Sequence, residues 1–117
     1  MRYHDVVPIS RGEAESAFAT DDAGRIIDAL LSVTYYDPDW RWVQGWCLRL
    51  AKSPSVWVRR TAVTCLGHLA RIHGVLDMHV VQPVLDELAK DPEVSGAVED
   101  AWDDIEQFLK KRKKRSA

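Results

Sequence analysis

The sequence predicts an all-α protein, a short α-solenoid of about two and a half to three antiparallel helix pairs. Three observations lead to this fold class. Apolar residues recur with helical spacing along most of the chain, and capping residues separate the apolar segments. Two segments also carry the same apolar spacings 36 to 38 residues apart. With 117 residues, of which 46% are hydrophobic and 29% charged, the chain has the size and composition of one folded domain.

Capping signals divide the chain into helical segments. Ser10 followed by Glu13 forms a capping box, and Gly74 after a basic turn is typical of a helix end. Three further residues that can cap a helix each stand before a proline. The predicted N-cap residues are Ser10, Asp37, Ser53, Asp77 and Asp91. The predicted helices cover about residues 10–19, 22–35, 38–52, 54–73, 77–90 and 92–112.

One helix pair occurs twice. The fourth predicted helix has its core positions at Val58, Ala62, Cys65, Leu66, Leu69 and Ile72. The last predicted helix repeats these spacings 36 residues later, at Val94, Val98, Ala101, Trp102, Ile105 and Phe108. The helices that precede them correspond at an offset of 38 residues. Such a period indicates stacked helix pairs, with residues 10–35 as a degenerate opening repeat.

The repeated unit resembles a HEAT repeat. Residues 58–70 are similar to the second helix of such a repeat, with Val-Arg, a small residue and Leu-Gly in order. Residues 91–94 resemble the turn within a repeat, and Pro83 stands where HEAT first helices often carry a kinking proline. Ser95 and Trp102 depart from the pattern, which suits a terminal repeat. The resemblance covers residues 37–109 and implies one HEAT-like domain over residues 1–110, followed by a basic C-terminal tail over residues 110–117.

Three segments also resemble small HEAT-like bacterial immunity proteins of polymorphic and contact-dependent toxin systems. These segments are residues 35–44, 67–74 and 98–105. The resemblance implies a cytoplasmic immunity protein that binds a toxin domain and neutralises it. The alternative from another class is a HEAT-type adaptor or scaffold subunit of a larger protein assembly.

Charge is distributed unevenly along the chain. Residues 1–109 hold 10 basic and 18 acidic residues, a net charge of −8, because six bases stand together at Lys110–Arg115. Between residues 86 and 109, nine acids accompany a single base, Lys90. Such a body repels phosphate and attracts a cationic partner. A basic toxin domain fits this requirement, and a nuclease is the expected class because its cleft must bind phosphate. The basic run itself either binds nucleic acid or complements the C-terminal helix dipole, and we favour the second interpretation.

Acidic and aromatic side chains are the candidate partner-binding residues. The acids of the last helix are a solvated helix surface or a partner-facing one, and both interpretations stay open. Among the five tryptophans, Trp40 and Trp46 fall on a core arc or its edge, whereas Trp42 and Trp57 lie off the arcs of their helices. The latter two either pack against a neighbouring repeat or anchor a partner. The candidate residues are Tyr35, Tyr36, Asp37, Asp39, Trp42, Trp57, Glu99, Asp100, Asp103 and Asp104.

The sequence carries no pattern typical of catalysis or metal binding. The four histidines lack metal-ligand spacing, and the six glycines form no phosphate-binding loop. Cys47 and Cys65 both lie on apolar helical stripes, which favours buried thiols in a reducing compartment over a disulfide. No apolar run reaches 18 residues, and no apolar signal core follows the N-terminus. We therefore expect no enzyme activity, no cofactor, no metal and no membrane partner.

Overall fold

The computed structural model describes residues 6–116, with side chains over residues 6–109. This part of the chain is all-helical and contains no strand, which confirms the predicted fold class. Its helices are α1 (Arg11–Phe18), α2 (Ala23–Tyr36), α3 (Trp40–Leu50), α4 (Val56–His73), α5 (Met78–Leu88) and α6 (Ser95–Ser116). The termini of the predicted helices agree with these to within about four residues at each end.

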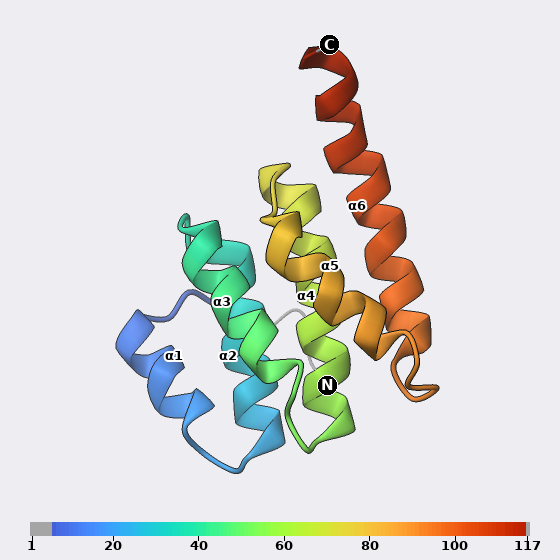
Figure 1. Ribbon diagram of the computed structural model, residues 1–117. Helices are drawn as coiled ribbons and strands as arrows, with labels where there is room; N and C mark the ends of the chain where they lie inside the picture. Colours follow the sequence, from blue (N-terminus) through green and yellow to red (C-terminus); the bar gives the residue numbers. More distant parts are fainter. Residues whose placement is uncertain (1–5, 117) are drawn as a thin grey trace.

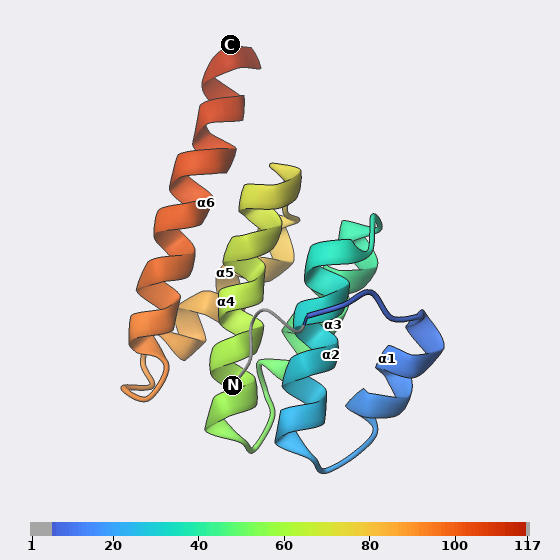
Figure 2. The ribbon, with the colours of Figure 1, turned by 180° about the vertical axis from the view of Figure 1, so that it is seen from behind.

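The helices form two layers, as a short solenoid requires. Helices α1, α3 and α5 lie on the side that faces the viewer in Figure 1, and α2, α4 and α6 lie behind them. Figure 2 shows the second layer from its other side, with α4 between α2 and α6. The centre of the fold is α4, which packs against α2, α3 and α6. The second layer therefore holds the consecutive helix pairs together.

One hydrophobic core runs through the helix pairs. The predicted core residues Val58, Ala62, Leu66, Leu69, Val98 and Ile105 are all buried. Ile72 is a wrong prediction, because its side chain is exposed. Ile72 lies about 20° beyond the buried Cys65 around the helix, at the edge of the buried arc, and in the last turn before α4 ends at His73.

The capping predictions hold at some helix ends and fail at others. Ser10 and Glu13 form the predicted capping box, with the Ser10 hydroxyl accepting from the Glu13 N–H at 3.0 Å. Gly74 ends α4 with φ 69°, the left-handed conformation that favours glycine. Asp77 occupies the N-cap position of α5 without a side-chain cap. Its own N–H donates instead to the buried Gln44 side chain at 2.8 Å.

The predicted caps Asp37 and Ser53 are wrong, because each helix begins two residues further along. Asp39 caps α3 and Ser55 caps α4. Asp37 accepts from the Asp39 N–H at 2.8 Å, and Ser53 accepts from the Ser55 N–H at 3.1 Å. Each side chain therefore closes a turn around its proline and presents the next polar residue as the cap.

The third such sequence, at Asp91, also forms this turn. Asp91 accepts from the Glu93 N–H at 2.9 Å, and α6 begins two residues beyond Glu93, at Ser95. The prediction that Asp91 caps a helix starting at residue 92 is therefore wrong in the same way.

Candidate partner-binding surface

The side of α2, α4 and α6 that is turned away from the first layer is called here the outer face. Figure 2 shows this face with α4 in its middle. Because α2, α3 and α6 cover the other sides of α4, one stripe of its residues remains exposed or half-exposed. These residues, called the α4 stripe, are Trp57, Arg60, Thr61, Thr64, His68 and Arg71.

Trp57 is the most exposed large hydrophobic residue among those whose side chains are described. Its exposed fraction is 62%, and the Arg60 guanidinium lies 5.5 Å from its ring centroid. It stands in the first turn of α4. Of the two interpretations that the sequence left open, exposure is the one that the structure shows for Trp57.

The candidate acids of α6 stand on the helix that packs against α4. Glu99, Asp100 and Asp103 are exposed, and Asp104 is half-buried. Asp104 lies against α4, because a Cβ built at Gly67 would be 2.9 Å from the Asp104 carboxylate oxygen Oδ2. The exposed acids are thus available to a partner, whereas Asp104 also belongs to the contact between α4 and α6.

His68 joins the three helices of the outer face. The Tyr35 ring of α2 lies 5.4 Å from the His68 ring, centroid to centroid. Arg71 donates to His68 Nδ1 at 2.8 Å, which places the proton of a neutral imidazole on Nε2. Burial lowers the pKa of His68, Arg71 lowers it further, and Asp104 opposes them. The neutral form of His68 is therefore favoured in the folded protein.

A second group of predicted residues lies around Arg11, which sequence reasoning missed. The Arg11 guanidinium donates to both carboxylate oxygens of Asp37, at 3.0 and 3.1 Å, and to Asp39 at 3.2 Å. It also lies 4.4 Å from the centroid of the Trp42 ring, which packs against the core. The ion pair lowers the pKa of Asp37. Sequence spacing gave no signal, because Arg11 is 26 residues from Asp37.

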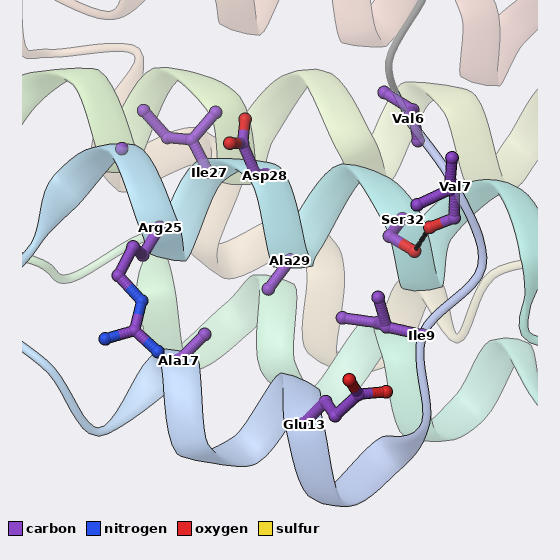
Figure 3. A pocket seen from close by; sticks show the side chains of 11 residues that line it. Val6, Val7, Ile9, Glu13, Ala17, Arg25, Ile27, Asp28, Ala29 and Ser32 are labelled. Atoms are coloured by element: carbon purple, nitrogen blue, oxygen red, sulfur yellow. Dashed lines mark hydrogen bonds between the residues drawn. The ribbon is translucent and has the colours of Figure 1, made fainter.

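A groove of about 740 Å³ lies along α2, between this helix, α1 and the segment before α1. Figure 3 shows Val6, Val7 and Ile9 along one wall of it, with α2 and α1 on the others. The hydroxyl of Ser32 donates to the Val7 carbonyl, and the Tyr36 hydroxyl donates to the Val6 carbonyl at 3.3 Å. The segment before α1 is therefore fastened to α2, and Tyr36 takes part in holding it.

The cysteines and the metal-ligating residues form no centre in the described part of the chain. Cys47 and Cys65 are free and fully buried, and burial together with the neighbouring Cys65 thiol raises the pKa of Cys47 well above its ordinary value. Within residues 6–109, no three His, Cys, Asp or Glu side chains lie close enough together to hold a metal ion. None of the described helices has the length and hydropathy of a membrane-spanning helix.

The chain is similar to one chain of a solved structure, the crystal structure of a CDI complex from Cupriavidus taiwanensis LMG 19424. The two are 36% identical over 92% of this chain and 97% of that chain, with a TM-score of 0.81. The chain belongs to the same family as that CDI-complex protein. Neither a protein-family model nor a curated protein sequence matches the chain.

The similarity between this chain and the CDI-complex chain extends over nearly the full length of both. The resemblance to HEAT repeats stays a prediction from the residue pattern, because no family model matches the chain. The side chains of Lys110–Arg115 lie outside the described residues, so the basic run keeps the two interpretations given above.

Proposed function

We propose that the chain is a CDI immunity protein, which binds a toxin domain of a contact-dependent growth inhibition system and neutralises it by occlusion, without catalytic turnover. The observation that carries this proposal is the 36% identity to a protein of a CDI complex over nearly the full length of both chains. A toxin that acts inside the cell must be met there, so a cytoplasmic location is part of the proposal.

The proposed partner is a cationic toxin domain, with a nuclease as the expected class. The net charge of −8 over residues 1–109 supports a basic partner, because opposite charges accelerate encounter and exclude wrong partners. A nuclease needs a basic cleft to bind phosphate. Covering such a cleft would block the substrate sterically and would cancel the field that attracts it.

We assign the contact to the outer face. Trp57 supplies an exposed aromatic anchor, the kind of residue that dominates the binding free energy of interfaces. Tyr35 extends the aromatic surface onto α2, and Glu99, Asp100 and Asp103 supply the acidic field from α6. Arg11 forms ion pairs with Asp37 and Asp39 and lies over the Trp42 ring. We therefore propose these three residues as a rigid border of the contact and not as a source of free negative charge.

The experiment is co-expression with the C-terminal domain encoded by the adjacent upstream gene, followed by co-purification and a titration of toxin activity. We expect a stable complex and complete inhibition at a molar ratio of 1:1. A substoichiometric amount that inactivates all of the toxin would indicate turnover and would overturn occlusion. The absence of a complex, with both proteins folded, would overturn the immunity function.

A further inference from the structure

Two cations of the α4 stripe have no acidic partner among residues 6–109. Arg60 and Arg71 are exposed, and neither forms an ion pair with a carboxylate of residues 6–109. Their neighbour Arg59 differs, because it bonds to the carbonyls of the preceding loop and to Asp91. Arg60 and Arg71 therefore present positive charge on the outer face of a domain whose net charge is negative.

The acids of α6 run parallel to these cations. Helices α4 and α6 lie side by side and point in the same direction (Figures 1 and 2). The contact of Gly67 with Ala101 and Asp104 sets their register, so that along the helix axis Asp100 and Asp103 stand at a level between Arg60 and Arg71. Packed helix axes are about 8–10 Å apart. Arg60 with Arg71, and Asp100 with Asp103, thus form a positive row and a negative row on neighbouring helices.

Because the rows are about 8–10 Å apart, the electrostatic field that a partner meets at long range differs from the field that it meets on contact. The screening length is about 8–10 Å at physiological ionic strength, so a distant partner is attracted by the net negative charge. A partner that has docked faces each row separately. A uniformly basic surface would place like charges against Arg60 and Arg71, at a cost to affinity.

We propose that the outer face recognises a toxin surface of mixed charge, with carboxylates opposite Arg60 and Arg71 and with lysines or arginines opposite Asp100 and Asp103. This inference rests on the proposed function, and it names the chemistry of the surface that the partner brings to α4. The two rows then fix the orientation of the toxin as well as its affinity.

The test compares two double variants that change the net charge by the same amount. Arg60→Glu with Arg71→Glu reverses the α4 cations. Lys52→Glu with Lys90→Glu reverses two exposed bases in the loops after α3 and α5, and serves as the matched control. Binding to the purified toxin domain is measured by surface plasmon resonance, with thermal unfolding as the check on folding.

The proposal predicts that the two double variants change toxin binding in opposite directions. The control should associate with the toxin as fast as the wild type or faster, because the protein becomes more acidic. The arginine variant should bind at least about tenfold more weakly, a change of about 1.4 kcal/mol. A uniformly basic partner instead predicts tighter binding for both variants. Unchanged or tighter binding of the arginine variant would therefore overturn the mixed-charge surface and leave the immunity function standing.

A further variant protects the test against misfolding. Arg60→Gln with Arg71→Gln removes the charges without reversing them, so it should bind with an affinity between those of the wild type and the Glu variant. An affinity at or above that of the wild type would overturn the proposal. Failure of the wild type itself to bind the toxin would overturn the proposed function together with this inference.

Discussion

Gly67 on α4 meets Ala101 on α6 so closely that a Cβ at Gly67 would lie 3.2 Å from the Ala101 Cα. This contact lies in the interface of the two helices that pack most extensively against each other. Because glycine lacks a side chain, the backbones approach here, and the approach sets which residues of α6 stand beside those of α4. The alignment of the charged residues of α6 along α4 therefore depends on the glycine at position 67.

Gly67→Ala is expected to destabilise the fold by about 1–3 kcal/mol, because the added methyl group overpacks a backbone contact. Gly45→Ala on α3 is the control, since a Cβ there would meet no atom within 4 Å. That variant should gain up to about 1 kcal/mol from the higher helix propensity of alanine. Urea unfolding measures both. Equal stability changes for the two variants would contradict the close contact.

Leu66→Ala is expected to cost about 2–5 kcal/mol, because Leu66 is fully buried and its truncation leaves a cavity. Ile72→Ala, in the same helix but exposed, should change the free energy of unfolding by no more than about 0.5 kcal/mol. The same unfolding experiment applies. A large decrease in the free energy of unfolding for Ile72→Ala would show that Ile72 belongs to the core, as its spacing in the sequence predicted.

Trp57→Ala and Trp42→Ala are expected to fail in different ways. Trp57 is exposed, so its removal should leave stability within about 0.5 kcal/mol and weaken toxin binding by about 2 kcal/mol or more, through faster dissociation. Trp42 packs against the core beneath Arg11, so its removal should cost more than about 1 kcal/mol of stability. Unfolding curves and dissociation rates on both variants test this assignment, which reversed behaviour would refute.

Asp100→Lys with Asp103→Lys is expected to slow association with the toxin more than it accelerates dissociation, since exposed charges act mainly by steering. The deficit should shrink as salt rises, because screening shortens the range of the field. Asp104 is left unchanged because it contacts α4. Association rates at several salt concentrations measure the effect. An unchanged association rate at low salt would show that these acids are only a solvated surface.

His68 predicts a pH dependence of stability. Burial lowers its pKa in the folded state, so the unfolded chain binds the proton more readily. The neutral His68 therefore contributes to folding stability above the ordinary histidine pKa of about 6.5. This contribution is lost as the pH falls through the lower pKa that His68 has in the folded protein. The low pKa of Asp37 acts in more acidic solution. Between about pH 7.5 and 5.5, His68→Gln should lose less stability than the wild type.

The exposed His79 provides the control for that experiment. His79→Gln should leave the free energy of unfolding within about 0.5 kcal/mol of the wild type at about pH 7.5, because substitutions of exposed residues have small effects. If His68→Gln and the wild type lose the same stability over this range, His68 does not account for the pH dependence.

Apolar spacing and capping residues predicted the helices, their order and most of their core. The spacing of Val58, Ala62, Leu66 and Leu69 fixes which side of α4 is buried, because side chains four and seven residues apart share one face of a helix. The pair repeated at 36 to 38 residues predicts stacked helices for the same reason. Residues near in sequence decide local features such as the Ser10 capping box.

Which polar and aromatic side chains stay available to a partner depends on how the helices pack against one another. Trp42 and Trp57 both lie off the arcs predicted from their helices. Arg11 reaches Trp42 from another helix, whereas the Arg60 guanidinium near Trp57 comes from the same helix and the Trp57 side chain stays exposed. Asp37 and Asp103 are both acids in the sequence, and only the fold neutralises one of them with a cation 26 residues away. Periodicity describes one helix at a time, whereas ion pairs and stacking depend on how separate helices meet in space.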